Sequence, residues 1–383
     1  RGYSDLVMYN LDTTGAVLTD TNDVDIFTEG NDKFDALLAD IREAKHFIHM
    51  QYYIIKDDVL FQRIKDALLK KAAQGVEVRI LFDGMGCRLV RKKVWKQLNR
   101  QGIRTAEFFP IRLRRLHLRI NYRNHRKIVV IDNKVAYVGG FNIGKEYVGL
   151  DEKFGHWRDT HLRIRVGGLE LRFLLDWNYA AGENLFADPK YMSGFIPQSR
   201  DLCDMQIIYS GPDTSLQPIR DNYVRLINKA EKVIYIQTPY FVPDESVLTA
   251  LMIAIRSGVE VNLMIPCKPD HMFVYWATCS YMGELVMAGA NCFIYNNGFL
   301  HTKAIMVDDK VFSCGTANMD IRSFALNFEV NAMIYDAEVT KELEYIFLND
   351  IGKSEELTLY DYRQRSFKIR VKEQVSRLLS PLL

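Results

Sequence analysis

Two short stretches of this sequence carry the same reactive residues at the same spacing. Each copy holds a histidine, a lysine two positions later, an aspartate five further on and an asparagine ten beyond it: His125, Lys127, Asp132 and Asn142, then His301, Lys303, Asp308 and Asn318. A small-residue turn precedes each asparagine, GGFN in one copy and GTAN in the other. Because so long a pattern does not recur by chance at ordinary residue frequencies, it indicates a duplicated functional site.

These residue types suit the chemistry of a phosphoester. Lysine, asparagine and backbone N–H groups stabilise the negative charge that develops on phosphoryl oxygens under attack. Strand alternation puts His and Lys of H-x-K on one face. A histidine titrating near neutral pH acts as a nucleophile or as a proton shuttle, and a pair of histidines divides the two roles. The repeat therefore predicts a two-histidine phosphate site that works without a metal.

Each imidazole also needs a carboxylate that orients its second nitrogen. Asp159, in WRDTHLRI, and Glu329, in NFEVNAMI, follow the two motifs in comparable strand-like stretches and are the candidates. The motif aspartates Asp132 and Asp308 belong to the candidate catalytic set, but each closes an apolar strand before a turn, DNKV or DDKV. For these two, a turn-fixing role is favoured over direct chemistry.

The two motifs resemble the paired HKD signatures of the phospholipase D superfamily. The flanking sequence is similar to bacterial cardiolipin synthases from about Asp25 to the C-terminus. The similar segments include DIREAKHFIHMQYYI, KAAQGVEVRILFDGMG and QTPYFVPDES. The resemblance implies a pseudo-twofold pair of α/β halves with the active site at their junction. It also implies transfer of a phosphatidyl group between two phosphatidylglycerol molecules through a phosphohistidine, giving cardiolipin and glycerol.

Other functions remain open from the residues alone. Water competes with the acceptor hydroxyl, so a hydrolytic phospholipase D is one alternative. A nuclease or other phosphodiesterase with the same histidine pair is a second, and a membrane-binding scaffold with a dead site is a third. The formal charge of +2 over 383 residues gives no global signal for nucleic acid, and none is expected as a partner.

A second, weaker repeat predicts the elements that must position the motifs. Residues 44–51 resemble 230–237, and GVEV recurs at 75–78 and 258–261. Short apolar strands alternate with helical stretches, which predicts an α/β fold with sheets flanked by helices. The expected organisation is a lead-in (1–25), a first half (26–200), a second half (201–350) and a basic amphipathic segment (351–383). A turn-rich stretch, 183–203, is the expected connection between the halves.

Two local features predict contact with anionic lipid. One is the run of arginines before the first motif, Arg112, Arg114, Arg115 and Arg119. The other is the C-terminal segment, in which Phe367 and Leu378 belong to an apolar helical stripe and Arg370 to the surrounding charge. An ordinary exposed ribbon is the alternative for the first. A helix docked on its own domain or on a second subunit is the alternative for the other.

The sequence contains no apolar run long enough to span a bilayer; 272–290 comes nearest and predicts a buried or lipid-facing helix. The resemblance implies hydrophobic N-terminal segments before Arg1, and a catalytic part on the cytoplasmic face of a bacterial cell membrane. Phosphatidylglycerol and anionic lipids are the expected partners, with a homodimer possible.

The six cysteines show no C-x-x-C spacing and no acidic metal cluster is present, so neither a metal nor another cofactor is expected. The other histidines, His49 among them, are interpreted as packing or surface residues.

Overall fold

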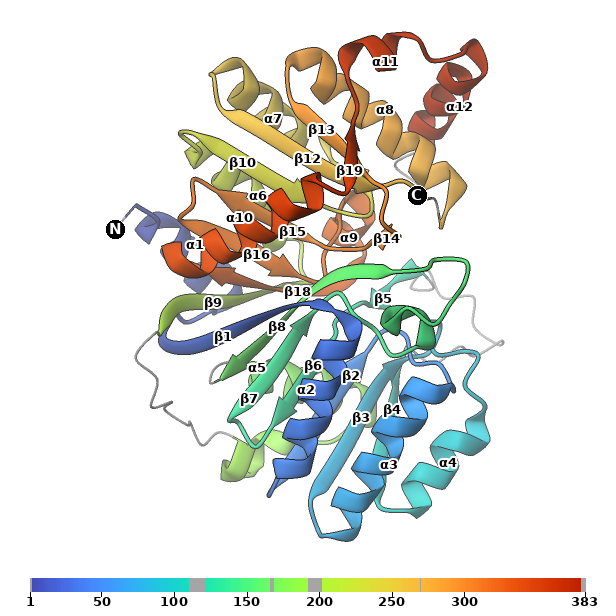
Figure 1. Ribbon diagram of the computed structural model, residues 1–383. Helices are drawn as coiled ribbons and strands as arrows, with labels where there is room; N and C mark the ends of the chain where they lie inside the picture. Colours follow the sequence, from blue (N-terminus) through green and yellow to red (C-terminus); the bar gives the residue numbers. More distant parts are fainter. Residues whose placement is uncertain (1, 110–120, 166–168, 192–201, 269, 380–383) are drawn as a thin grey trace.

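The computed structural model describes residues 2–109, 121–165, 169–191, 202–268 and 270–379. It consists of two α/β halves stacked one above the other (Figure 1), and the predicted fold class is confirmed. Arg112, Arg114, Arg115 and Arg119, the arginines predicted to contact lipid, lie outside the described residues.

The first half consists of a mixed sheet with helices on both faces. Its strands are β1 (Thr19–Glu29), β2 (Phe47–Tyr52), β3 (Glu77–Asp83), β4 (Ile103–Phe108), β5 (Arg123–Asn124), β6 (Ile128–Ile131), β7 (Val135–Gly139) and β8 (Trp157–Arg165). Its helices are α2 (Gly30–Glu43), α3 (Val59–Ala73), α4 (Lys92–Arg100) and α5 (Leu169–Ala181), with short 3₁₀ helices at Lys145–Val148, Leu185–Ala187 and Pro189–Tyr191.

The second half repeats this plan, and α1 (Ser4–Thr14) packs against it. Its strands are β9 (Cys203–Ser210), β10 (Val233–Gln237), β11 (Phe241–Val242), β12 (Glu260–Pro266), β13 (Asn291–Tyr295), β14 (Phe299–Leu300), β15 (Ala304–Val307), β16 (Val311–Gly315), β17 (Met319–Asp320), β18 (Asn327–Ile334) and β19 (Ser354–Glu356). Its helices are α6 (Pro218–Lys229), α7 (Glu245–Arg256), α8 (Met272–Ala288), α9 (Ile321–Ala325), α10 (Ala337–Ile351), α11 (Leu359–Arg363) and α12 (Phe367–Leu378).

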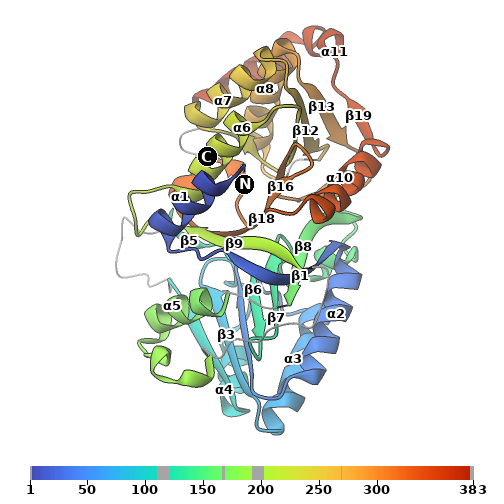
Figure 2. The ribbon, with the colours of Figure 1, turned by 90° about the vertical axis from the view of Figure 1, so that its left-hand side faces the viewer.

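Strand pairing shows the duplication directly. The first sheet has the order β1, β8, β7, β6, β2, β3, β4, and the second has β9, β18, β16, β15, β10, β12, β13, β19. Within the described part of each sheet, only three successive strands pair in parallel, β2, β3 and β4 in the first and β10, β12 and β13 in the second. Strands β1 and β9 pair antiparallel and join the two sheets edge to edge (Figure 2).

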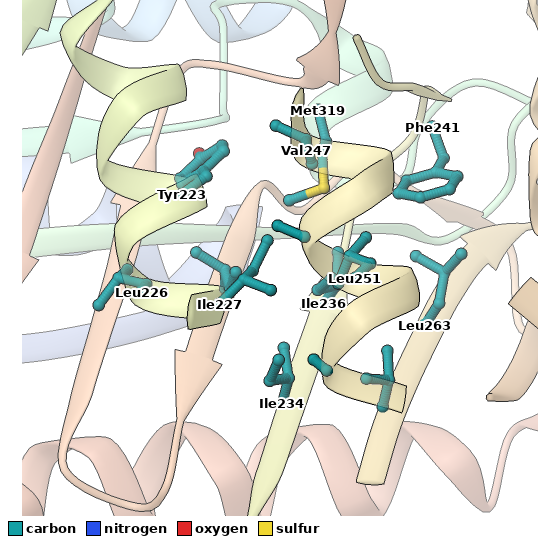
Figure 3. Packing of buried hydrophobic residues seen from close by; sticks show 14 of the residues in the cluster. Tyr223, Leu226, Ile227, Ile234, Ile236, Phe241, Val247, Leu251, Leu263 and Met319 are labelled. Atoms are coloured by element: carbon teal, nitrogen blue, oxygen red, sulfur yellow. The ribbon is translucent and has the colours of Figure 1, made fainter. Parts of the chain in front are cut away.

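Even the helix caps are duplicated, because Asp58 and Asp244 accept backbone N–H groups at the starts of α3 and α7. Each sheet buries apolar side chains on both faces. On the outer face of the second half, α6 and α7 cover β10 and β12 with residues such as Leu226, Val247 and Leu251 (Figure 3). Helix α5 flanks the sheet of the first half and α10 that of the second (Figure 2), and their apolar residues belong to one core cluster that includes strands of both halves.

This shared core fixes one half against the other. The short strands β5 and β14 lie at the boundary between the halves, which we call the seam. In the described ranges, no helix has both the length and the apolar character needed to cross a membrane.

Candidate active site

Both motif histidines lie at the seam, and each is held there by the backbone of the opposite half. Strand β5 pairs in parallel with β18, and the His125 N–H then donates to the Phe328 carbonyl at 2.9 Å. Strand β14 pairs in parallel with β8, and the His301 N–H donates to the Arg158 carbonyl at 2.7 Å. The two imidazoles are therefore positioned by equivalent contacts related by the pseudo-twofold arrangement.

The orienting carboxylates are exchanged between the halves. His125 Nδ1 lies 2.9 Å from Glu329 Oε1, and His301 Nδ1 lies 2.7 Å from Asp159 Oδ2. Both carboxylates are fully buried, whereas each imidazole keeps about a tenth of its surface exposed. Within the described residues, neither ring makes a hydrogen bond through Nε2. That nitrogen is the one available to a substrate.

The motif lysines are fully buried in the same site, and burial lowers the pKa of Lys127 to about 7 and that of Lys303 to about 8. The positive charge of Lys303 lowers the pKa of Lys127 further. Each lysine donates to the backbone carbonyl of its own motif histidine, Lys127 Nζ to His125 at 2.7 Å and Lys303 Nζ to His301. Lys303 Nζ also lies 2.7 Å from His301 Nδ1. An anionic phosphate would relieve this concentration of positive charge.

Burial likewise lowers the pKa of both histidines, that of His301 to about 4. For Asp159, burial alone would raise the pKa, but Lys303 and His301 outweigh it and bring the pKa below its usual value. At neutral pH the Asp159 carboxyl is therefore ionised and both imidazoles are neutral, and a neutral imidazole is the nucleophilic form.

The two motif asparagines differ in what they contact. Asn142 accepts the Ile54 N–H and donates to the Tyr147 hydroxyl, so protein groups occupy both ends of its amide. Asn318 is also buried, but its Oδ1 has no hydrogen-bond partner among the described residues. A phosphate oxygen needs the N–H end of an amide, and Asn318 Oδ1 is an acceptor. Phosphate binding by these two amides therefore stays a prediction.

The motif aspartates bond to backbone and not to either imidazole. Asp132 accepts the N–H groups of residues 45–47, and Asp308 accepts those of residues 231–233. Both have positive φ, 55° and 54°, at the turns that end β6 and β15. Their contacts fit the turn-fixing role that the sequence favoured, and the environment gives no support to direct chemistry.

Aromatic rings wall the two histidines, a feature that sequence reasoning missed. The Tyr53 ring lies edge-on to His125 at 4.9 Å, and the Trp157 ring lies 5.1 Å from His301. Lys127 Nζ also lies 5.6 Å from the centre of the Tyr53 ring. These rings limit water near the reacting nitrogens, which strengthens electrostatic interactions there.

Two buried arginines, also missed, brace the carboxylates through their backbone. Arg126 pairs with Asp176 at 2.7 Å and donates to the carbonyl of Glu329. Arg158 pairs with Asp350 at 2.8 Å and donates to the carbonyl of Asp159. Each arginine thus fixes the residue whose carboxylate orients a histidine. The sequence did hold a signal for these ion pairs, because Gln51 and Gln237 occupy equivalent positions of the weaker repeat. Gln51 donates to Asp176 and Gln237 donates to Asp350.

The described part of the chain contains no group of three or more His, Cys, Asp or Glu side chains arranged to hold a metal ion. Its cysteines are all free. Of the residues predicted to bind lipid, Phe367, Arg370 and Leu378 lie on α12, on the outer edge of the second half and not at the seam (Figure 1).

One known family matches two parts of this chain, and known proteins resemble it along its whole length. The profile of the "cardiolipin synthase, PLD-like domain" family matches residues 37–154 and 223–351. The major cardiolipin synthase ClsA of Bacillus subtilis (strain 168) is 51% identical over 383 residues, which cover 99% of this chain and 79% of that protein. A cardiolipin synthase of Oceanobacillus iheyensis is 50% identical, over 100% of this chain and 79% of its own length.

Solved structures share the fold at much lower identity. A phosphatidylserine synthase of Haemophilus influenzae Rd KW20 superimposes with a TM-score of 0.74 at 14% identity, over 99% of each chain. A polyphosphate kinase of Porphyromonas gingivalis gives 0.54 at 12% identity, over 92% of this chain and 56% of the kinase. These similarities support the two-halved architecture described above.

Proposed function

The chain belongs to the family of cardiolipin synthases with phospholipase D-like domains, and from this premise we propose that it joins two phosphatidylglycerol molecules into cardiolipin and glycerol. One observation carries the proposal: two imidazoles lie at one seam, each bound through Nδ1 to a buried carboxylate and each with an Nε2 that has no hydrogen-bond partner in the described part of the chain. This arrangement suits a double displacement at one phosphorus atom.

In the first step, His125 Nε2 attacks the phosphorus of one phosphatidylglycerol and forms a P–N bond. The P–O bond to the headgroup glycerol breaks, and His301 gives its Nε2 proton to the departing oxygen. A phosphatidyl-histidine and free glycerol result. Lys127, Lys303 and the amide N–H groups of Asn142 and Asn318 stabilise the charge on the non-bridging oxygens.

In the second step, His301 Nε2, now neutral, takes a proton from a headgroup hydroxyl of a second phosphatidylglycerol. The resulting oxygen attacks the phosphorus, the P–N bond breaks and cardiolipin leaves. His301 ends protonated, as the cycle requires. Because a bound phosphodiester raises the pKa of nearby cationic groups, substrate binding helps His301 to hold this proton.

The contacts of the two Nδ1 atoms support this division of roles. His125 Nδ1 lies within hydrogen-bond distance of two acceptors, Glu329 and the Thr316 carbonyl, which fix the Nδ1–H tautomer and leave the Nε2 lone pair free. His301 Nδ1 instead faces one acceptor, Asp159, and one donor, Lys303. This mixed environment suits a ring that repeatedly gains and loses a proton.

The setting of the reaction follows from its substrates. Phosphatidylglycerol resides in membranes, so we propose that the site works at the surface of a bacterial cell membrane, on its cytoplasmic face. Phospholipids are the partners in this proposal, and a homodimer is compatible with it but not required by the chemistry.

The test is to incubate the purified chain with vesicles of isotope-labelled phosphatidylglycerol and identify the products by mass spectrometry. Cardiolipin and glycerol in equal amounts are expected. A His125→Ala, His301→Ala double variant that still forms cardiolipin would contradict the scheme.

The same assay separates the hydrolytic alternative, because phosphatidic acid as the main product would identify a phospholipase D. Cleavage of single-stranded DNA by the wild-type chain, absent from the double variant, would instead identify a nuclease.

A further inference from the structure

The C-terminal helix α12 packs against α8 through its polar side, which reverses the usual order of an amphipathic helix in a water-soluble protein. Glu373, on the packed side, is 1% exposed and pairs with Arg365 at 3.0 Å. Arg377 on the same side pairs with Glu284 of α8 at 2.6 Å, and Ser376 is buried. The helix is therefore held in place by ion pairs and hydrogen bonds.

The opposite side of α12 is apolar and faces outward. Phe367 is 80% and Leu378 81% exposed, and Val371 and Val375 between them are also exposed. Spacings of four, four and three residues put these four side chains on one face, which we call the α12 stripe. A contiguous exposed apolar surface of this kind marks a binding site for an apolar partner.

Positive charge flanks the α12 stripe on both sides. Lys368 and Lys372 follow the stripe along one flank and Arg370 along the other, and all three are exposed. The one acidic residue of α12, Glu373, is buried and paired on the packed side. Two such helices meeting stripe to stripe would bring like charges together, which disfavours a second copy of this chain as the partner.

Helix α8, on which α12 rests, begins beside the catalytic seam (Figure 1). Tyr240 donates a hydrogen bond to Asp270, just before α8, and the charge of Asp270 raises the pKa of Lys303. Met272 and Phe273, in the first turn of α8, are both more than half exposed. An apolar partner bound to α12 would thus be anchored to the helix that leads into the site.

We propose that α12 is an in-plane membrane anchor, with its stripe in the acyl region and its lysines and arginine at the headgroups of an anionic phospholipid surface. Apolar burial and cationic flanks are what such a surface recognises. The inference rests on the proposed function only in that both involve phospholipids. It assigns the membrane contact to a helix remote in sequence from both histidine motifs.

The experiment measures co-sedimentation with vesicles of phosphatidylserine and phosphatidylcholine, neither of which is the proposed substrate. Phe367→Glu and Leu378→Glu are each expected to weaken binding roughly tenfold or more, because each removes a large apolar side chain from the bilayer. Tyr345→Glu and Leu348→Glu, on the exposed side of α10, are the matched controls and should bind as wild type.

A second set of variants tests the charge. Lys368→Gln, Arg370→Gln and Lys372→Gln combined should remove most of the preference for phosphatidylserine over pure phosphatidylcholine vesicles. Unchanged vesicle binding by the Phe367→Glu, Leu378→Glu double variant would overturn the proposal.

A shift of that variant from dimer to monomer in light scattering, with vesicle binding intact, would instead identify a second copy as the partner. Because the readout is binding, its failure is distinct from failure of the proposed reaction, which would appear as no cardiolipin from the wild-type chain.

Discussion

The two histidines at the seam have the same carboxylate contact, but different local structures produce it. At His301 the carboxylate is a short one, Asp159, and Gly140 lies against it: a Cβ at position 140 would lie 1.9 Å from Asp159 Oδ1. At His125 the carboxylate is the longer Glu329, and the position equivalent to Gly140 is Thr316, whose hydroxyl donates to Glu329 Oε2 at 2.5 Å.

The two halves therefore share the distance between the histidine Nδ1 and its carboxylate, but they reach it with different residues. One half-site makes room for its carboxylate, and the other holds a longer carboxylate with a hydrogen bond. Exchanging residues between equivalent positions, such as Gly140 and Thr316, is therefore expected to disturb the contact between carboxylate and histidine, even though the backbones match.

The largest expected effects come from the histidines themselves and test whether the half-sites differ in role. His125→Ala and His301→Ala should each lower cardiolipin formation by roughly 10³-fold or more. A phosphatidyl ester of p-nitrophenol, whose leaving group needs no proton, should separate them. His301→Ala should release one equivalent of p-nitrophenol in a burst and trap the phosphatidyl-enzyme, whereas His125→Ala should release none.

Equal bursts from both variants would contradict the assignment of the nucleophile. Intact-protein mass spectrometry of the trapped adduct, followed by peptide mapping to His125, provides the direct check.

The next largest effect on activity is expected at Gly140, which lies against the Asp159 carboxylate. Gly140→Ala should displace Asp159 from His301 and lower kcat by roughly 10²-fold, since a shift of about 1 Å in a catalytic group has that scale of effect. Gly352→Ala is the control, because its Cβ would meet nothing closer than 3.4 Å. Activity equal to that of the control would show that Asp159 is free to move.

On the other side, Thr316→Val keeps the shape but removes the hydrogen bond to Glu329. We expect a drop in kcat of roughly tenfold, the scale of one hydrogen bond to a charged group. Thr340→Val, in α10, removes a buried hydroxyl bond away from the seam and is the matched control. An effect larger than that of Gly140→Ala would reverse the comparison.

An effect of pH is expected through Lys127 and Lys303, whose pKa values burial lowers to about 7 and about 8. An anionic phosphate binds the protonated lysines, so the apparent KM for phosphatidylglycerol should rise by roughly tenfold or more between pH 7 and pH 9. Lys127→Arg, which stays charged, should show a flatter KM profile. Parallel profiles for wild type and variant would rule out Lys127 as the titrating group.

The smallest effect concerns stability and compares His49 with its repeat partner Tyr235. Burial opposes the charge on His49, but Glu170 at 2.8 Å and Glu77 at 3.2 Å outweigh it and raise the pKa. This stabilisation is complete below the unfolded pKa of about 6.5 and is lost as pH rises through the higher folded pKa. Tyr235, bonded to Glu344, does not titrate there.

We therefore expect the Tm of the wild-type chain to fall by a few degrees, roughly the scale of 1 kcal/mol, as pH rises past the folded pKa. His49→Gln should show a smaller fall in circular dichroism melts. The exposed His46→Gln is the control, and an equal pH slope in His49→Gln would contradict the assignment.

The duplicated motifs and the strand-helix alternation predicted the α/β halves, because local periodicity determines these elements. Asp159 and Glu329 also stood out as orienting carboxylates. Sequence could not show that each serves the histidine of the other half, since that depends on the β5–β18 and β14–β8 pairings across distant segments. Nor could it identify Arg126 and Arg158 as buried braces, because a charged residue is exposed by default.

The environment of the C-terminal helix could not be predicted from the sequence either. Its apolar stripe predicted either a membrane contact or docking on its own domain, and periodicity alone does not say which face is covered. The structure shows docking on α8 through the polar face, which leaves the stripe outward.

The exchange of carboxylates makes each half chemically incomplete by itself. A separately expressed first half would bury Asp159 with no imidazole to balance it and leave His125 without its acceptor. Reassembly of two fragments should therefore restore both half-sites at once or neither. Because each carboxylate contacts the histidine of the other half, a substitution beside the carboxylate of one repeat affects the histidine of the other repeat. The sequences of the two repeats therefore cannot change independently around the site.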